Sequence, residues 1–358
     1  MSTERAGARP RLTFFCELAA EPLAALFAAD SEPAGSAVIA DLVALGAGVS
    51  LGILDLSPER AAVVRRLNQA GVPVRAWLLL PESDGYWFNA NNAEPAAARY
   101  EAFKRWTAEH ELRWEGVGLD IEPDMREIEA LRVNWRGVAL ALRRRLFSGD
   151  LLRRAEGDYA ALVARIRADG YHVDSYVLPF IVDERLAGSR ILRRLLGLVD
   201  VPANREIPML YSSFVRPAGP GFLWSYAPGA PSVGVGSTGG GVKVAGANKV
   251  PPLSWEELTR DLLLAFAWTD DIHVFSLEGS VERGYLDRLV AFDWHQPVEM
   301  PSGLARRVEL GRRALRAGLW AGSNPAAIAF GLVALYRVWR ALHAGCCRGR
   351  REDDGWCC

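Results

Sequence analysis

The segment WEGVGLDIEPD, residues 114–124, ends an apolar run with three carboxylates at alternate positions, Asp120, Glu122 and Asp124. Side chains alternate between the two faces of a strand, so Asp120 and Glu122 project from the same face. Two carboxylates about 6–7 Å apart perturb each other's proton affinity, and one is expected to keep its proton near neutral pH. That pair would suit a general acid with a charged neighbour. Asp124 is expected to be the N-cap of the following helix.

Further polar and aromatic residues follow other apolar runs. Glu278, in HVFSLEG, offers a second carboxylate that would face Glu122 across a substrate. Tyr211 follows another run and adds a hydroxyl. Aromatic rings stack on sugars, and carboxylate, amide and hydroxyl groups bind sugar hydroxyls. On this basis we predict six substrate contacts: Glu17, Asp84, Trp87, Asn89, Tyr176 and Trp224.

The elements that position these residues alternate between apolar runs and amphipathic stretches. Predicted strands lie in 11–18, 49–56, 72–81, 115–121, 171–180, 206–215 and 271–279. Predicted helices lie in 37–48, 57–71, 94–110, 127–146, 150–168, 184–198, 254–270 and 281–292. Strands separated by helices of this length pair in parallel, and continuous apolar strands fit a sheet covered on both faces.

The best fit to this alternation is an α/β fold of the TIM (β/α)₈ type, about 280 residues long. The eighth strand either lies in 231–237, within a long Gly/Pro loop over 216–253, or is missing. A doubly wound open sheet is the alternative. Against it, no Gly-rich phosphate loop follows the first predicted strand. In such a barrel, reactive residues collect at the C-terminal ends of the strands.

The last 65 residues differ from the barrel region. A basic helix is predicted over 303–316, and 317–336 then runs for 20 residues without a charge. That run is either a membrane-associated or spanning tail, with contact through 317–344, or a helix packed against the barrel or a partner. We therefore divide the chain into a catalytic barrel (1–300), a helical segment (301–344) and a disordered, cysteine-containing tail (345–358).

Composition excludes several classes of protein. Net charge is −1, which gives no basic excess for nucleic-acid binding. The N-terminus lacks an apolar h-region, so we expect no secretory signal and a cytoplasmic protein. Cys346, Cys347, Cys357 and Cys358 lie near the end of the chain, in a spacing unlike that of a zinc ribbon. We expect no metal and no cofactor.

The segment EGVGLDIEPD resembles the fourth-strand motif, DxxDxDxE, of family 18 glycoside hydrolases, the chitinase-like barrels. The aligned positions are Glu115, Gly118, Asp120 and Glu122, of which the last two match. In that family the Glu protonates the glycosidic oxygen. The preceding Asp orients the substrate's N-acetyl group, whose carbonyl attacks the anomeric carbon. The resemblance implies these roles for Glu122 and Asp120.

Two more segments are similar to the same family. PMLYSSF looks like its sixth-strand Met-x-Tyr segment, with Met209 and Tyr211 matching and Ser212 in place of the usual Asp. The resemblance implies that Tyr211 helps to hold the N-acetyl group. HVFSLEG looks like the family's final strand, with Phe275 where Trp is usual.

A second resemblance is to the large clan of retaining glycosidase barrels. These carry an acid/base Glu after the fourth strand, often in Asn-Glu-Pro, and a nucleophilic Glu after the seventh. Glu122 and Glu278 follow the fourth and seventh clear strands here, although Ile121 replaces the Asn. This resemblance implies that Glu278 is the nucleophile, with the two carboxyls about 5–5.5 Å apart.

We therefore predict a retaining glycoside hydrolase with a carbohydrate substrate and Glu122 as general acid/base. A non-catalytic carbohydrate-binding or scaffold barrel derived from a hydrolase is one alternative. A metal-dependent phosphodiesterase barrel is another, although the predicted strand ends lack histidines. Geometry separates the first two: a hydrolase needs Glu122 in an aromatic-lined cavity, whereas a scaffold has a blocked mouth or acids paired with arginines.

Overall fold

The computed structural model describes residues 9–28, 33–134, 136–137, 145, 149–241 and 250–349. Eight parallel strands form one sheet in the order β6-β5-β4-β3-β2-β1-β8-β7. A parallel bridge between Met209 and Gly234 joins the two edges, so the sheet is a nearly closed TIM barrel. The strands are β1 (Arg11–Cys16), β2 (Gly48–Ile53), β3 (Val74–Leu78), β4 (Gly116–Ile121), β5 (His172–Val177), β6 (Arg205–Pro208), β7 (Val233–Gly236) and β8 (Asp271–Phe275).

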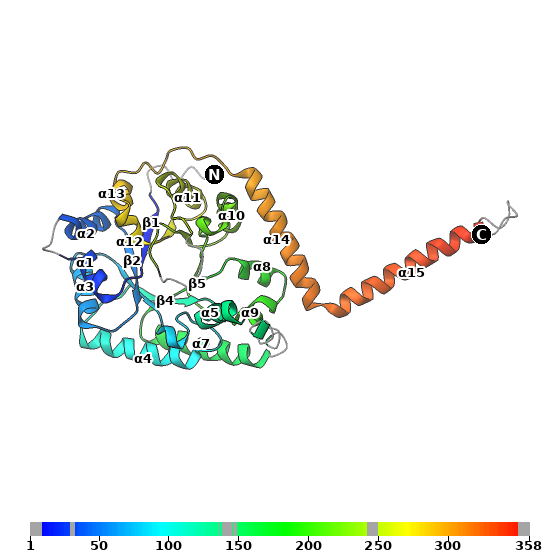
Figure 1. Cartoon of the computed structure of the whole chain (residues 1–358), viewed down its shortest axis with the longest axis horizontal. Coiled ribbons are helices and arrows are strands. Elements are labelled where there is room, and N and C mark those ends of the chain that lie inside the picture. Colours follow the sequence, from blue (N-terminus) through cyan, green and yellow to red (C-terminus); the bar gives the residue numbers. More distant parts are fainter. Residues whose placement is uncertain are drawn as a thin grey trace.

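Helices surround this barrel (Figure 1). They are α1 (Ala20–Leu26), α2 (Pro33–Leu45), α3 (Pro58–Gln69), α4 (Ala93–Glu109), α5 (Met125–Val133), α7 (Gly149–Ala168), α8 (Phe180–Leu186), α9 (Ile191–Leu196), α10 (Gly219–Tyr226), α11 (Trp255–Phe266), α12 (Leu277–Glu282) and α13 (Tyr285–Val290). Two 3₁₀ turns, η2 (Glu82–Asp84) and η3 (Ser212–Val215), follow β3 and β6. The predicted cap at Asp124 is confirmed, because Asp124 accepts the Arg126 backbone N–H at the start of α5. Ser57 is the N-cap of α3 and accepts the Arg60 backbone N–H.

The eighth strand lies within 231–237, as β7, which excludes the doubly wound alternative. Its sequence, VGVG, is short and half glycine, so it gives a weak strand signal inside the Gly/Pro-rich segment. The segment 271–279 therefore contains the eighth strand rather than the predicted seventh. Glu278 does not occupy the position of a nucleophile after the seventh strand.

Other boundaries also differ from prediction. Only Arg205–Pro208 of the predicted strand 206–215 is extended, and the rest turns into η3. The predicted helix 184–198 is two helices, α8 and α9, and the predicted helix 281–292 is divided between α12 and α13. Gly188 and Gly284 stand at these breaks with φ of 62°, a left-handed conformation that ends a helix at little cost in glycine.

The end of the barrel away from the carboxylates is closed by a network of charges. Asp174 in β5 is fully buried and accepts hydrogen bonds from Arg75 and Arg205, at 2.5 Å and 2.7 Å. Arg205 also pairs with Asp271, which receives Arg11 at 3.0 Å. Each buried charge therefore has an opposite partner, as burial in a barrel requires.

The C-terminal segment forms two helices, α14 (Ser302–Ser323) and α15 (Pro325–Gly349). α14 packs on the barrel because Gly221 in α10 lets the backbones approach: a Cβ there would lie 2.5 Å from the Leu304 carbonyl carbon. Arg312 of α14 reaches the buried carboxylate of Asp183 at 3.1 Å and covers the Tyr226 ring at 3.8 Å. The predicted helical segment is therefore partly a component of the barrel's surface.

α15 leaves the barrel and projects away from it (Figure 1). It continues to Gly349, beyond the predicted boundary at 344, and includes Cys346 and Cys347, while Cys357 and Cys358 lie outside the described residues. No single helix in the described ranges is long and apolar enough to cross a membrane. Only α14 and the first part of α15, bent by 95° at their junction, pass that test together.

Candidate active site

A cavity of about 1310 Å³ opens at the C-terminal ends of the strands. Six of the predicted site residues line it: Glu17, Trp87, Asp120, Glu122, Tyr176 and Tyr211. The remaining wall is mainly aromatic and aliphatic, and a loop containing Gly239, Gly240 and Gly241 borders it. The site therefore combines carboxylates with an unusually apolar surrounding.

Asp120 in β4 and Glu122, directly after β4, both face this cavity, which confirms that they project to the same side. Asp120 is buried, and its Oδ2 accepts a hydrogen bond from the Trp77 indole N–H at 3.1 Å. Its Oδ1 is buried with no hydrogen-bond partner among the described residues. An unpartnered buried carboxylate oxygen is costly, and it is available to a donor on a bound molecule.

A third carboxylate, Glu17, joins this pair from the end of β1. It is buried, and its Oε1 accepts a hydrogen bond from the Tyr86 hydroxyl. Hydrogen bonding to a carboxylate favours its charged form. The charge of Glu17 acts on the other two acids.

The electrostatics of the cluster follow from burial and mutual repulsion. Burial, and then the charge of Glu17, raise the pKa of Glu122 to about 7. Burial, followed by the charges of Glu122 and Glu17, raises the pKa of Asp120 well above its ordinary value, against the opposing Trp77 hydrogen bond. Burial and the same three acids also raise the pKa of the Tyr211 hydroxyl. The cluster thus keeps protons that isolated carboxyls would lose at neutral pH.

The loop after β3 delivers Tyr86 and Trp87 to the cavity. Phe88 in this loop donates its backbone N–H to the Asp120 carbonyl at 2.8 Å, so the loop lies against the end of β4. Gly85 and Tyr86 have φ of 100° and 65°, and a Cβ at Gly85 would lie 3.0 Å from the Asp124 carboxyl. A left-handed Tyr is uncommon, which indicates that the surrounding contacts determine its position.

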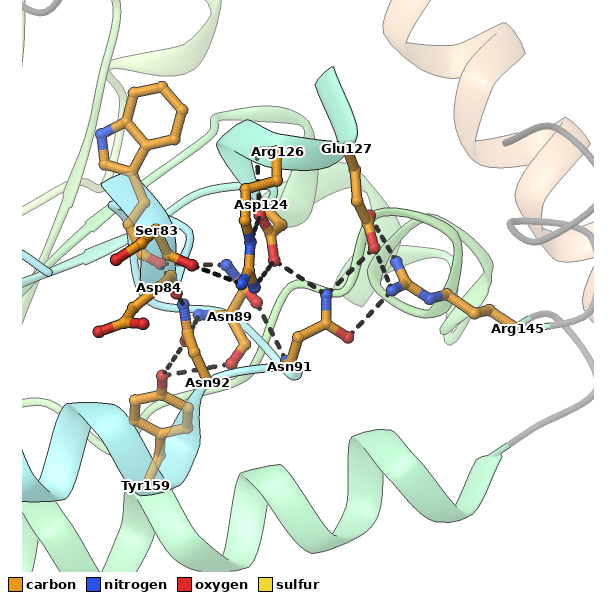
Figure 2. A network of polar contacts seen from close by, with 11 residues as sticks. Ser83, Asp84, Asn89, Asn91, Asn92, Asp124, Arg126, Glu127, Arg145 and Tyr159 are labelled. Atoms are coloured by element: carbon orange, nitrogen blue, oxygen red, sulfur yellow. Dashed lines mark hydrogen bonds and ion pairs between the residues drawn. The ribbon is translucent and has the colours of Figure 1, made fainter. Parts of the chain in front are cut away.

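Figure 2 shows the polar network that fixes this loop. Asn92 is 1% exposed and donates to the carbonyls of Asp84 and Trp87, while its Oδ1 accepts from the Asn89 backbone and the Tyr159 hydroxyl. Asp124 holds Arg126, whose guanidinium donates to the Ser83 carbonyl at 2.8 Å. Further out, Glu127 pairs with Arg145 and accepts from Asn91.

Tyr176 fills the space that Gly118 of β4 leaves. A Cβ at Gly118 would lie 2.5 Å from the Tyr176 hydroxyl oxygen, so this ring packs directly beneath the acids. The hydroxyl is 2.7 Å from Ser50 Oγ. Phe15 and Trp77 make edge contacts with the Tyr176 ring, with ring centroids 4.8 Å and 6.2 Å away. Close packing below the carboxylates accounts for their desolvation.

Four predicted site residues are not among those that line the cavity: Asp84, Asn89, Trp224 and Glu278. Asn89 is buried and hydrogen-bonds within the loop, and Trp224 packs against Trp268 with ring centroids 4.8 Å apart. Glu278 lies near the start of α12, where its Oε1 accepts the Gly241 backbone N–H at 3.3 Å. A Cβ at Gly240 would collide with this carboxylate, so the glycine loop passes directly over it.

The sequence interpretation missed Trp77 and the pairing of Tyr86 with Glu17. Arg75 and Trp77 are two positions apart in β3 and therefore point to the same face. Two large side chains with polar N–H groups on one face of an apolar strand indicate that this face lines the barrel interior. The Tyr86 contact joins residues 69 positions apart and depends on a left-handed backbone, so no local pattern marks it. Among the described residues, no group of three or more His, Cys, Asp or Glu side chains is arranged to hold a metal ion.

Solved structures with related barrels have low sequence identity to this chain. The glycoside hydrolase domain of PgaB (BpsB) from Bordetella bronchiseptica is 11% identical, covers 79% of this chain and 98% of its own, and has a TM-score of 0.45. D-Allulose 3-epimerase from Methylomonas sp. is 14% identical over 85% and 98%, with a TM-score of 0.40. A xylose isomerase-like barrel from Mycobacterium smegmatis in complex with magnesium is 14% identical over 80% and 97%, with a TM-score of 0.41. No family model and no curated protein matches the chain. Identities and TM-scores at this level transfer no residue role to it.

Proposed function

We propose that this protein is a retaining glycoside hydrolase in which Glu122 is the general acid. The observation that carries the proposal is the position of Glu122: it lines the cavity beside Asp120 and Glu17, where burial and the Glu17 charge raise its pKa to about 7. A general acid works best when its pKa lies close to the working pH. Glu122 would give its proton to the glycosidic oxygen as the bond to the anomeric carbon breaks.

Asp120 is the proposed orienting residue for a substrate N-acetyl group, the role that its match to the family 18 motif implies. Its buried Oδ1 lacks a protein donor among the described residues and would accept the N–H of the acetamide. The acetamide carbonyl oxygen then attacks the anomeric carbon while Glu122 protonates the leaving oxygen. Glu122 then deprotonates a water molecule, which attacks the anomeric carbon from the side that the leaving group occupied. The ring formed by the acetamide opens, so the anomeric configuration is retained.

The position of Glu278 favours this substrate-assisted route over the two-glutamate route. Glu278 follows the eighth strand, is not among the residues that line the cavity, and accepts a backbone hydrogen bond from the glycine loop. A nucleophile must reach the anomeric carbon from the side opposite the leaving group. Glu278 would need the loop at Gly240 to move before it could do so.

The non-catalytic alternative predicts acids neutralised by arginines or a blocked mouth. In the described ranges no arginine hydrogen-bonds or pairs with Asp120 or Glu122, and both acids line the cavity. Two carboxyls whose pKa values are raised by burial lower the stability of the folded protein. A non-catalytic scaffold would gain nothing from that loss. These observations support an enzyme.

The experiment is a screen of 4-nitrophenyl glycosides, including N-acetyl-β-D-glucosaminide, with the parent and Glu122→Gln. Loss of the general acid should lower kcat at least about 100-fold while substrate binding persists. Glu129→Gln, an exposed change on α5, is the matched control and should keep the parent rate. A Glu122→Gln protein that hydrolyses a confirmed substrate at the parent rate would sink the proposal.

Two further measurements separate the mechanisms. Proton NMR of the first product formed should show the anomeric configuration of the substrate. Glu278→Gln should retain most activity if the substrate's own acetamide is the nucleophile, whereas a trapped glycosyl ester on Glu278 would establish the two-glutamate route.

A further inference from the structure

One part of the cavity wall has no hydrogen-bonding side chains. We call it the apolar wall, and it consists of Leu178, Phe180, Phe214, Val215, Phe222 and Val250. These residues come from the β5–α8 connection, η3, α10 and the chain before α11. The carboxylates come instead from the ends of β1 and β4. The cavity therefore has a polar floor and an apolar wall built by different elements.

The apolar wall is only partly covered by the protein itself. Phe214 is 60% exposed, and Phe180 and Phe222 are half-buried. Apolar surface that remains in contact with water inside a cavity is a driving force for binding an apolar group. The cavity volume of about 1310 Å³ also exceeds the usual range of about 300–1,000 Å³, so there is room beyond the sugar at the carboxylates.

A second sugar would suit this wall poorly. Sugar rings stack on aromatic faces, but their hydroxyls then need donors or acceptors around the edge, and phenylalanine and aliphatic side chains offer none. A hydroxyl that leaves water without a partner loses free energy. Near the carboxylates, by contrast, Tyr211 and Ser237 provide hydroxyls.

We propose that the substrate is an amphipathic glycoside, with its sugar at Asp120 and Glu122 and a long, lipid-like aglycone along the apolar wall. This inference rests on the proposed function, because it assumes that the acids act on the glycosidic bond between the two parts. Tyr226 also lines the cavity, next to Phe222 at 5.0 Å between ring centroids, but its hydroxyl donates to Asp183 and its ring lies under Arg312 of α14.

The test uses N-acetyl-β-D-glucosaminides with methyl, butyl and octyl aglycones, all below their micelle concentrations, and a matched series with oligo(ethylene glycol) aglycones of equal length. We expect kcat/KM of the parent to rise at least tenfold from methyl to octyl, because each buried methylene adds affinity. The ethylene glycol series should show little rise. A flat response to alkyl length, with hydrolysis intact, overturns the proposal.

Variants locate the effect. Phe222→Ser and Phe214→Ser should each remove at least half of the alkyl-length dependence, measured as the logarithm of kcat/KM. Leu186→Ser is the control, since Leu186 is 64% exposed on α8 and does not line the cavity. If Phe222→Ser and Phe214→Ser keep the parent's dependence on alkyl length, as Leu186→Ser should, the apolar wall is not the aglycone site.

Failure of the proposed function is distinguishable from failure of this inference. Calorimetric binding of the same two series to Glu122→Gln needs no turnover. Binding that tightens with alkyl length, in a protein whose parent hydrolyses none of the glycosides, supports the amphipathic ligand and rejects the hydrolase. Hydrolysis whose kcat/KM does not depend on alkyl length supports the hydrolase and rejects the amphipathic substrate.

An independent observation concerns α15. Large apolar side chains are exposed along its first half: Ile328, Phe330, Leu332, Val333, Leu335, Tyr336 and Trp339. Neighbours in the sequence such as Leu332 and Val333 point about 100° apart around a helix, so the apolar surface is not a single narrow stripe. α15 extends away from the barrel, which does not cover this surface (Figure 1).

The charges around this surface have one sign. Residues 310–351 contain eight arginines and no acidic residue. Arg337 and Arg340 follow the apolar run directly, beside Tyr336 and Trp339. Aromatic residues of this kind favour the boundary between lipid headgroups and acyl chains, and arginines favour anionic headgroups.

We infer that α15 binds the surface of an anionic lipid bilayer and lies along it. The 95° bend between α14 and α15 argues for a helix that rests in the interface rather than one straight span. An amphipathic substrate in the same bilayer would then be near the cavity, because α14 joins α15 to the helices that carry Phe180 and Phe222.

Flotation of the full chain with phosphatidylcholine vesicles, with and without one quarter phosphatidylglycerol, tests this inference. We expect at least fivefold more bound protein on anionic vesicles. Phe330→Ser with Leu335→Ser should abolish binding, Arg337→Gln with Arg340→Gln should remove the preference for anionic lipid, and Leu186→Ser should change nothing. Equal flotation of all variants, or dimerisation by light scattering that the Phe330/Leu335 variant abolishes without any vesicle binding, overturns it.

Discussion

At the scale of single residues, the site is governed by three carboxyls that share a desolvated space. Glu17 has a hydroxyl donor, Asp120 has an indole donor, and Glu122 is the acid whose pKa rises to about 7. Their order of protonation belongs to the cluster as a whole, since each charge acts on the others. Two residue-scale predictions follow from the same charges.

The first concerns activity. If Glu122 must be protonated to act as general acid, kcat/KM should fall as pH rises through about 7. Tyr86→Phe removes the hydroxyl that stabilises the Glu17 charge, so the repulsion that raises the pKa of Glu122 should weaken. The descending limb should therefore move to lower pH in this variant. A pH–rate profile checks it, and a lower rate with an unmoved limb would assign Tyr86 a purely structural role.

The second concerns stability. The pKa of Glu122 is higher in the folded chain than its usual 4.5, so the folded state binds more protons between pH 4.5 and 7 and its stability falls over that range. Glu122→Gln removes the titrating group. It should raise the free energy of unfolding at pH 8 relative to the parent and give no such gain at pH 4. Urea denaturation at the two pH values measures the difference, and an equal change at both would contradict it.

At the scale of elements, the loop after β3 is the part that brings aromatic residues to the carboxylates. It has little regular structure, and side chains add to the backbone hydrogen bonds that hold it: the Asn92 side chain alone makes four hydrogen bonds. The loop is also tied to β4 through Phe88 and to α5 through Asp124, so three elements determine where Tyr86 stands. Its rigidity is therefore a property of tertiary contacts.

Asn92→Ala should expose this dependence. It leaves the Asp84 and Trp87 carbonyls without their donor, and we expect a loss of about 2–3 kcal/mol of stability together with a rise in KM, because the loop carrying Tyr86 and Trp87 loosens. Asn91→Ala, an exposed change in the same loop, should cost less than about 1 kcal/mol. Thermal unfolding and steady-state kinetics give the two readouts, and equal effects of the two variants would refute the argument.

At the scale of the whole molecule, the barrel separates its charges. Asp120 and Glu122, which have no arginine partner among the described residues, lie at the C-terminal end of the barrel, and a paired network of arginines and aspartates closes the other end. The pKa of Asp174 lies below its usual value, because the hydrogen bond from Arg205 and the charges of Arg75 and Arg205 outweigh burial. The end that holds Asp120 and Glu122 therefore carries an unfavourable electrostatic energy, which the end with the paired arginines and aspartates lacks.

Asp174→Asn should be among the most damaging single changes in the barrel, costing about 3–5 kcal/mol, because it leaves the buried Arg75 guanidinium with only the exposed Glu115. In the parent, the Asp174 contribution is complete above the unfolded pKa of about 3.8 and is lost as pH falls through its lowered folded pKa. Urea unfolding should show a large difference between parent and variant at pH 7 and a smaller difference at pH 3. Asp150→Asn, which breaks an exposed ion pair, should change neither value by more than about 0.5 kcal/mol.

The sequence by itself determined the parallel barrel, the shared face of Asp120 and Glu122, and the capping role of Asp124. Each depends on alternation, helix-length spacing or a local cap, and these patterns act over a few residues. It also indicated the region of the eighth strand, although two glycines in VGVG weakened that signal and led to the wrong count of strands before Glu278.

Tertiary structure decided which acids meet. Glu17 joins the pair because β1 and β4 end on the same rim, and Tyr86 reaches it through a left-handed turn held by Asn92 and Asp124. Glu278 is also a carboxylic acid that follows a strand, but it lies beneath the glycine loop instead. Proton affinity depends on burial and on the charges within a few ångströms, and both are set by contacts between residues far apart in the chain.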